Sequence, residues 1–360
     1  MKQSGLTLIL FLFLTATGWS AKPDSLKYIN ATNFELTGKG FTDTENVYDR
    51  LPSYLNGKTR PPVWSLSKNC SGLAIRFRTN SPVIAAKWEV TGDVVMNHFA
   101  PSGIKGLDLY CLKNGKWQFV NSARPAGKTT TTVIIDHMSG NDMEYMLYLP
   151  LYDGLVNLEI GVKSTAAIGN PLVDSPRKEK PVVFYGTSIT QGGCASRAGM
   201  AYPSQLSRML NRQIINLGFS GNGQLDLEIA EAMATIDASC FVMDCLPNVT
   251  TAQMNEKYVR FLELIREKKP EVPILLVESI LFPHMYFDQT VFSLLQEKNS
   301  VLHKIYTEQK KKGDRHLYYM KAGQLIGNDS EATVDGVHLT DLGFLRMAQN
   351  LYPVIRKLIK

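Results

Sequence analysis

The chain has 360 residues, of which 44% are hydrophobic and 20% are charged, a composition that excludes extended disorder and collagen-like structure. Lys and Arg outnumber Asp and Glu by 39 to 33, but the charges are scattered, so the net charge of +6 does not predict a nucleic-acid partner. No apolar run reaches the ~20 residues of a membrane-spanning helix, and we expect no stable membrane insertion. The length favours two domains.

The N-terminal segment has the pattern of a secretory signal peptide. Lys2 precedes an apolar run from Leu6 to Leu14, and several small residues follow, the last of them Ala21. A basic start, a hydrophobic stretch of about 7–15 residues and a small-residue exit are the three parts of such a peptide. We therefore expect residues 1–21 to be removed and the mature chain to be exported to the periplasm or the extracellular space.

The segment 22–167 predicts a β-sandwich, jelly-roll-like domain. β-branched and aromatic residues form short runs separated by Gly, Pro, Asn and Ser, at 72–79, 83–90, 131–135, 144–149 and 155–162. Asn114-Gly115, between two further runs at 109–112 and 117–120, predicts a hairpin because both residue types tolerate the positive φ of a tight turn. Several short strands without good helices favour a sandwich.

A charged segment with Pro and Gly, 168–180, predicts an interdomain linker, and the periodicity changes after it. Strands expected at 182–185, 213–217, 240–244, 274–279 and 317–320 alternate with helices expected at 202–210, 225–235, 254–268, 290–311 and 342–359. Such alternation implies parallel strands joined by right-handed crossovers. We predict that residues 181–360 form a doubly wound, flavodoxin-like, three-layer α/β/α domain.

Polar residues follow several of these strands at their carboxyl ends, where open α/β sheets bind ligands. Ser188 follows the first strand at the start of a helix, where backbone N–H groups favour developing negative charge, although a Ser there is more often a helix cap. The glycine-rich segment 218–223 follows the second strand and Asn248 the third, and each is also compatible with a plain turn. Before the last helix, Asp335 can fix the tautomer of His338 while the other ring nitrogen takes a proton from Ser188.

In this order, the Ser, Gly, Asn and Asp-x-x-His segments resemble the four blocks of the SGNH, or GDSL-like, hydrolase family. The resemblance covers about residues 180–360. It implies a serine esterase with Ser188 as nucleophile, His338 as general base and then acid, and Asp335 as the partner that orients His338. It also implies an oxyanion hole made by the backbone N–H groups of Ser188 and Gly221 and the side-chain amide of Asn248. No metal or organic cofactor is implied.

The upstream half carries a second resemblance. Gly106-Leu-Asp-Leu-Tyr110 is similar to the Gly-x-Asp-Leu-Tyr segment of a β-rich domain that precedes SGNH-type hydrolases in secreted bacterial proteins. Two positions depart from the hydrolase pattern, because Thr187 replaces the usual acidic residue before the Ser and no Asp follows Asn248. Neither position supplies the proton transfer, so the departures bear on the substrate more than on activity.

The resemblance and the expected export favour O-deacetylation of a carbohydrate, with a small-molecule or glycan ester as the substrate. Glu278, His284 and Arg197 are candidate substrate contacts, and each also fits a structural or solvated role. A lipid esterase or thioesterase acting on longer acyl chains is the alternative within the same chemistry. An alternative of another class is a carbohydrate-binding protein with a vestigial hydrolase site, in which tryptophans of the β-rich half would stack on sugars.

The five cysteines do not form a disulfide scaffold. Their odd number leaves at least one thiol unpaired, and at most two bridges are possible. Cys240 and Cys245 have no matching Cys/His pair, so no zinc site is predicted from them. We expect most of the cysteines to be small buried apolar side chains. The sequence does not indicate the oligomeric state.

Overall fold

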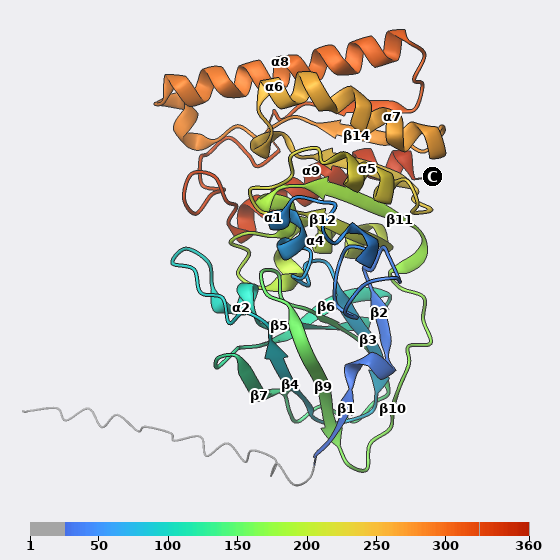
Figure 1. Cartoon of the computed structure of the whole chain (residues 1–360). Helices are drawn as coiled ribbons and strands as arrows, with labels where there is room; N and C mark the ends of the chain where they lie inside the picture. The colour runs from blue at the N-terminus through green and yellow to red at the C-terminus, as the bar shows by residue number, and fades with distance from the viewer. Residues whose placement is uncertain (1–25, 324, 360) are drawn as a thin grey trace, which may run out of the picture.

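The computed structural model describes residues 26–323 and 325–359, which form an antiparallel β part and an α/β part stacked on each other (Figure 1). The expected signal peptide, residues 1–21, lies outside the described residues. Among the helices of the described part, none combines the length and the apolar character needed to cross a membrane.

The N-terminal part consists of two antiparallel sheets. One has the strand order β1 (Leu26–Asn30), β9 (Leu155–Lys163), β4 (Ile84–Val90), β7 (Thr129–Ile135). The other has the order β10 (Ile168–Gly169), β3 (Ala74–Thr79), β8 (Met143–Tyr148), β5 (Leu107–Lys113), β6 (Lys116–Ala123), with β2 (Glu35–Thr37) also paired to β3. Side chains of both sheets, Phe77, Trp88 and Ile160 among them, share one apolar core. Asn114 and Gly115 turn the β5–β6 hairpin with positive φ values of 51° and 72°, and the predicted β-rich domain is confirmed.

The C-terminal part is a parallel five-stranded sheet in the order β12 (Arg212–Gly218), β11 (Arg177–Gly186), β13 (Cys240–Asp244), β14 (Ile274–Val277), β15 (Leu317–Met320). The following strands lie on both sides of β11, so the strand order reverses there. Alternate residues of β11 enter different cores, Val182 and Phe184 on one face and Val183 and Tyr185 on the other. The predicted doubly wound sheet is confirmed, and its switch point, where such folds bind ligands, is the end of β11.

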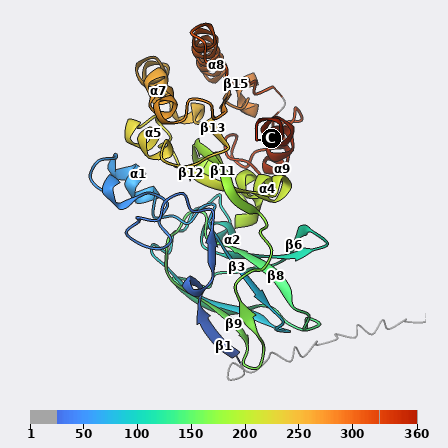
Figure 2. The same ribbon diagram turned by 90° about the vertical axis from the view of Figure 1, so that its right-hand side faces the viewer.

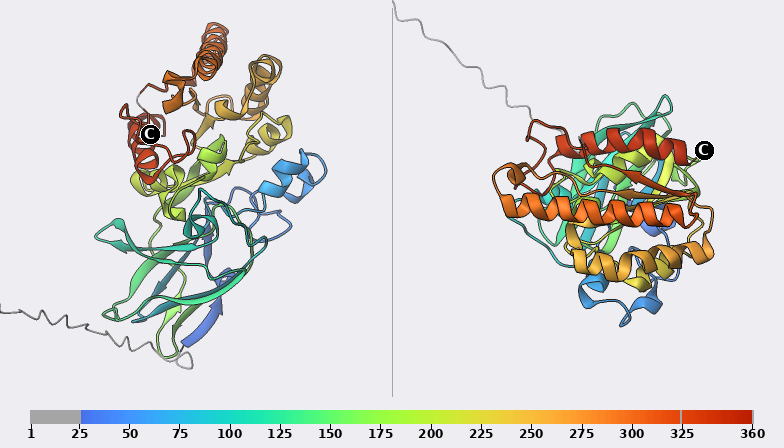
Figure 3. Two further views of the ribbon diagram at one scale, coloured as in Figure 1. Left: turned by 90° about the vertical axis from the view of Figure 1, so that its left-hand side faces the viewer. Right: turned by 90° about the horizontal axis from the view of Figure 1, so that it is seen from above.

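Helices cover both faces of this sheet. The helices α4 (Tyr202–Leu210) and α9 (Asp341–Leu358) contribute to one core, and α5 (Leu227–Met233) and α7 (Val259–Lys268) contribute to the other. Seen from above, α8 (Gln289–Lys311) runs between α9 and α7, and it contacts the edge strand β15 (Figure 3). The helix expected at 254–268 begins with a π-helical turn, Met254–Tyr258, before α7.

The remaining helices are short. They are α1 (Pro61–Leu66), α2 (Pro101–Ile104), α3 (Ser188–Gln191), α6 (Thr251–Gln253) and the 3-10 turns Ala31–Asn33, Ser53–Leu55, Ala198–Met200, Leu246–Asn248 and Pro283–Tyr286.

Part of the N-terminal segment packs on the α/β part. Leu51 and Val63 are fully buried in the same core as α5 and α7, and α1 lies beside α5 (Figure 2). Arg60 pairs with Asp226, the residue that precedes α5, at 2.6 Å. The segment 168–180, expected to be a linker, starts as β10 in the β part, and Arg177 near its end already begins β11. The two parts are therefore joined by contacts well beyond the connecting segment.

Candidate active site

Ser188 lies at the carboxyl end of β11, as the first residue of α3. Thr187 caps this helix, because its hydroxyl accepts a hydrogen bond from Ile189 N at 3.2 Å. A Cβ at Gly186 would overlap Thr190 Oγ1, so only glycine permits the close approach of the strand exit to α3. Ser188 is 7% exposed after this tight turn, at the carboxyl end of the strands.

The Asp335–His338 turn brings an imidazole to this hydroxyl. His338 Nε2 lies 3.0 Å from Ser188 Oγ, and His338 Nδ1 lies 2.8 Å from Asp335 Oδ2. Asp335 Oδ1 also accepts hydrogen bonds from the backbone N–H groups of Val337 (3.0 Å) and His338 (2.7 Å). Partial burial opposes ionisation of Asp335, but the bonds from His338 and Val337 outweigh it and lower its pKa to about 2. Asp335 is thus a carboxylate at neutral pH and holds the proton of His338 on Nδ1.

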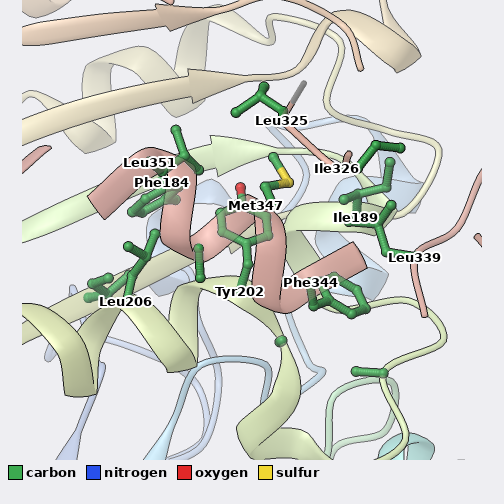
Figure 4. Close-up of a cluster of buried hydrophobic side chains, with 14 of the residues drawn as sticks. Phe184, Ile189, Tyr202, Leu206, Leu325, Ile326, Leu339, Phe344, Met347 and Leu351 are labelled. Carbon is green, nitrogen blue, oxygen red and sulfur yellow. The ribbon is translucent and has the colours of Figure 1, made fainter. Parts of the chain in front are cut away.

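A shared hydrophobic core holds the two segments together although they are 150 residues apart. Ile189, next to Ser188, and Leu339, next to His338, are both buried against α9 side chains such as Phe344 (Figure 4). Burial of a large apolar side chain contributes about 1.5–3 kcal/mol to stability. The positions of Ser188 and His338 are therefore set by the core beneath them rather than by loops alone.

The glycine-rich loop and the Asn248 loop are tied to the Ser188 loop by hydrogen bonds. Phe219 N donates to Gly186 O (3.0 Å), and Gly223 N donates to Asn248 Oδ1 (3.3 Å). Asn248 uses its oxygen in this contact, which leaves its amide NH2 as the free donor end. Gly221 is exposed near the tip of the glycine-rich loop. The three loops of the predicted oxyanion hole thus meet at one edge of the sheet.

Gln191, at the end of α3, is a positioning residue that the sequence pattern did not indicate. Its side chain is fully buried, and its Oε1 accepts a hydrogen bond from Ser220 N at 2.9 Å. Its Nε2 donates to Asn69 Oδ1 and to Leu151 O in the β part. Gln191 therefore links the nucleophile helix to the glycine-rich loop and to the N-terminal part.

Arg197, expected as a candidate substrate contact, joins the two parts of the molecule. Its guanidinium donates to Asp108 Oδ2 (2.7 Å) and Tyr110 OH (2.6 Å) and lies 3.8 Å from the ring centroid of Phe119. Asp108 is fully buried and also accepts from Gly199 N at 2.8 Å. The Gly-x-Asp-Leu-Tyr segment thus contacts the loop that follows the nucleophile helix, and Arg197, whose side chain is 20% exposed, is held there by an ion pair.

The other two expected substrate contacts lie in different places. Glu278 accepts hydrogen bonds from Tyr319 OH and from Ala322 N (2.8 Å), and it lines a surface pocket with His303 that does not include Ser188 or His338. His284 packs against the Asp335–His338 turn, because a Cβ on Gly336, whose φ is +89°, would come within 2.9 Å of His284 Nδ1. The structure therefore places His284, and not Glu278, beside the predicted triad.

A buried carboxylate lies behind the nucleophile helix. Asp244, at the end of β13, accepts hydrogen bonds from Tyr202 OH (2.8 Å) and Thr190 Oγ1 (3.1 Å). Burial disfavours its charge, and these two bonds offset only part of that effect, so the pKa of Asp244 is raised to about 7. Asp244 ties the end of β13 to α3.

Two further side chains border the predicted triad. His98 comes from the loop after β4 in the β part, and its ring centroid lies 5.5 Å from that of His338. Cys194 follows α3, is 7% exposed and has a positive φ of 73°. Burial first, and the charge of Asp335 second, raise the pKa of the Cys194 thiol to about 12. No local motif marks either residue, because they meet His338 only in the folded chain.

The cysteines form no disulfide in the structure. All five are free, four of them are buried, and Cys111 is half-buried. They are therefore mainly small buried side chains.

Comparisons with known proteins agree with this architecture. Residues 179–356 match the model of the GDSL-like lipase/acylhydrolase family, and residues 26–168 match the N-terminal domain model of SGNH-hydrolase-type esterases. A GDSL-like lipase from Bacteroides ovatus ATCC 8483 is 41% identical, with a TM-score of 0.89, over 93% of this chain and 98% of that one.

Two more distant structures share the fold. A salicylyl-acyltransferase from a tetracycline biosynthetic pathway is 17% identical, with a TM-score of 0.75, over 94% of this chain and 98% of that one. An acetyl xylan esterase from Butyrivibrio proteoclasticus is 13% identical, with a TM-score of 0.56, over 92% of this chain and 98% of that one. No curated protein matches the chain.

Proposed function

Because the chain belongs to the GDSL-like lipase/acylhydrolase family and is a hydrolase of ester bonds, we propose that it removes acetyl groups from an O-acetylated carbohydrate through an acyl-enzyme on Ser188. Two consecutive contacts support this mechanism. Ser188 Oγ lies 3.0 Å from His338 Nε2, and His338 Nδ1 lies 2.8 Å from Asp335 Oδ2.

In the first half of the reaction, Ser188 Oγ attacks the ester carbonyl and His338 Nε2 takes the hydroxyl proton. Such general base catalysis contributes typically about 10²–10⁴ in rate. The charge of Asp335 stabilises the imidazolium that forms. His338 then gives this proton to the departing alcohol oxygen. In the second half, a water molecule loses its proton to His338, attacks the acetyl-enzyme and releases acetate.

The tetrahedral intermediate carries a negative oxygen that requires hydrogen-bond donors. The backbone N–H of Ser188 at the start of α3, the N–H of Gly221 and the amide of Asn248 are the proposed donors. Loss of one such donor costs about 10²–10³ in kcat in serine hydrolases. The bond from Gly223 N to Asn248 Oδ1 supports this role, because it turns the oxygen of Asn248 away from the donor position.

The surroundings of Gly221 support a hydroxyl-rich substrate. Gln224 Nε2 donates to Gly221 O (2.9 Å), and Gln253 Nε2 lies 3.4 Å from Gln224 Oε1. Arg60 Nη1 donates to Asn222 Oδ1 at 3.0 Å on the same loop. Half-buried amide side chains offer both donors and acceptors, which suits sugar hydroxyl groups better than a lipid chain.

One observation favours longer acyl chains as a second candidate. Phe287 is 90% exposed and Tyr286 is 62% exposed, and both follow His284, which packs against the Asp335–His338 turn. Exposed aromatic side chains on the segment that carries His284 offer an apolar surface for an acyl chain.

The binding-protein alternative receives less support. Trp88 is 1% exposed, and its indole N–H donates to Lys105 O at 3.0 Å, so it belongs to the sandwich core and does not present a face to sugars. The Ser188–His338 contact also has the geometry that a working base requires.

The test compares wild type with Ser188→Ala on 4-nitrophenyl esters from acetate to octanoate, and on glucose penta-acetate with acetate release as the readout. The control Ser65→Ala changes an exposed serine of α1. We expect Ser188→Ala to lose at least 10³-fold in kcat, Ser65→Ala to match wild type, and acetate to be preferred over octanoate at least tenfold.

Three other outcomes would change the proposed function. Equal activity of wild type and Ser188→Ala would refute the nucleophile. A preference for octanoate would replace the deacetylase with an esterase of longer chains. Binding of acetylated sugar without acetate release would favour the binding-protein alternative.

A further inference from the structure

Three metal-ligating side chains from three separate segments converge beside Ser188. A ring nitrogen of His98, the sulfur of Cys194 and a ring nitrogen of His338 all lie within 4.8 Å of one another. His98 belongs to the β part, whereas Cys194 and His338 belong to the α/β part. The proposed esterase mechanism uses only one of the three.

In both imidazoles Nδ1 lies beside an acceptor oxygen, and His338 Nε2 faces only the Ser188 hydroxyl, at 3.0 Å. His98 Nδ1 lies 3.0 Å from Asn97 Oδ1, and in the tautomer that donates to this oxygen the lone pair for a metal is on Nε2. His338 Nδ1 faces the Asp335 carboxylate at 2.8 Å, so its Nε2 also has the lone pair. Histidines that bind zinc in proteins typically have an acceptor oxygen beside their other ring nitrogen, as both of these do.

The donor set selects the type of cation. Two imidazoles and a thiolate suit Zn²⁺ and similar late transition metals, whereas Mg²⁺ and Ca²⁺ prefer oxygen ligands. Bonds of ~2.0–2.1 Å to nitrogen and ~2.3 Å to sulfur place tetrahedral ligand atoms roughly 3.3–3.6 Å apart. The three ligand atoms lie within 4.8 Å of one another, so they need to approach by at most about 1–1.5 Å. His98 can supply this movement, because its side chain is 34% exposed on a loop.

The surrounding charge favours a cation. Asp335 Oδ2, which contacts His338 Nδ1, also lies 3.9 Å from His98 Nε2, so one carboxylate borders both imidazoles. A bound ion displaces the proton of the Cys194 thiol and leaves a fourth coordination position for water or the Ser188 hydroxyl.

We propose that His98, Cys194 and His338 bind one zinc-type divalent cation, and that this ion inhibits the esterase by occupying His338 Nε2. The inhibitory consequence rests on the proposed function, because it requires His338 to act as the general base. The ion would also connect the β part to the α/β part at the site.

The experiment uses the full chain after treatment with a chelator and desalting. Zn²⁺ is titrated into the protein by calorimetry, Co²⁺ is added to a second sample to detect a thiolate charge-transfer band, and 4-nitrophenyl acetate turnover is followed with and without Zn²⁺ and EDTA. The ligand variants are His98→Ala and Cys194→Ser. The matched controls are His137→Ala, whose side chain is 79% exposed, and Cys111→Ser on β5.

We expect one Zn²⁺ per chain, a thiolate band with Co²⁺, and at least tenfold inhibition that EDTA reverses. His98→Ala and Cys194→Ser should each raise the dissociation constant, and the Zn²⁺ concentration for half-inhibition, at least tenfold while keeping turnover without metal. The control variants should behave as wild type. Circular dichroism verifies that each variant is folded.

The site is refuted if His98→Ala and Cys194→Ser bind and respond to Zn²⁺ as wild type does, or if wild type binds no stoichiometric ion. Stoichiometric binding without inhibition refutes the inhibitory role. If wild type shows no esterase activity, the proposed function and the inhibition fail, whereas calorimetry and the Co²⁺ spectrum still decide the metal site.

Discussion

Replacing Asp335 with asparagine separates the orientation of His338 from the folding of its turn. The asparagine oxygen can take the place of Asp335 Oδ1, which accepts from the backbone N–H groups of Val337 and His338. Its NH2 group then faces His338 Nδ1 and can only donate, so the imidazole must carry its proton on Nε2, toward Ser188. In that tautomer His338 cannot accept the proton of the attacking hydroxyl.

The size of the effect follows from the 2.8 Å contact between Asp335 and His338. A carboxylate and an imidazolium at that distance attract each other by about 6 kcal/mol at an effective dielectric constant of ~20. Asp335 is one-third exposed, so solvent screening reduces this to about half. A loss of about 3 kcal/mol corresponds to ~10²-fold in rate, and the wrong tautomer adds to it. We therefore expect Asp335→Asn to lower kcat about 10³–10⁴-fold, close to the loss of ~10⁴ known for this substitution in a Ser-His-Asp triad.

The assay measures kcat on 4-nitrophenyl acetate and thermal unfolding for Asp335→Asn and Asp335→Ala. Both variants should lose activity to a similar degree. Only Asp335→Ala should also lose the two backbone hydrogen bonds, about 2 kcal/mol of the free energy of unfolding.

Retention of more than one-tenth of wild-type kcat by a folded Asp335→Asn protein would refute the orienting role of Asp335. If both variants lost the same amount of thermal stability, Asp335→Asn would be disturbing the fold of the Asp335–His338 turn rather than the tautomer of His338.

Two further predictions concern the other loops. Asn248→Ala should lower kcat on 4-nitrophenyl acetate about 10²–10³-fold with little change in KM, because it removes a proposed oxyanion donor. A loss of kcat below threefold would contradict the role of Asn248 as such a donor. Asp244→Asn should flatten the pH dependence of thermal stability. The pKa of Asp244 is raised to about 7 in the folded protein, whereas the same side chain in the unfolded chain loses its proton near pH 4. Wild-type stability therefore falls as the pH rises between these two values, and the asparagine variant should lack this fall. Parallel wild-type and Asp244→Asn curves of unfolding temperature from pH 4.5 to 8 would show that Asp244 does not carry this effect.

Local patterns in the sequence predicted the two kinds of fold and the candidate segments of the site, and the family resemblance implied the roles of their residues. The alternation of strands and helices after residue 181 determines a parallel sheet, because each element must bury one face. The same rule placed Ser188, Asn248 and His338 beyond strand ends, where the structure brings Ser188 and His338 within 3.0 Å. Such features depend on residues close in the chain, and one sequence contains that information.

Tertiary structure alone decided what surrounds these residues. The partner of Arg197 is Asp108, which lies 89 positions earlier in the chain, and His98 reaches the Asp335–His338 pair from the other part of the molecule. Residues near Leu51, expected within the sandwich, are buried against the α/β sheet instead. Periodicity reports which face of an element is buried but not which distant element covers it. For that physical reason the sequence determined the folding units and the order of the site segments, and only their packing determined the contacts between domains, including the His98–Cys194–His338 cluster.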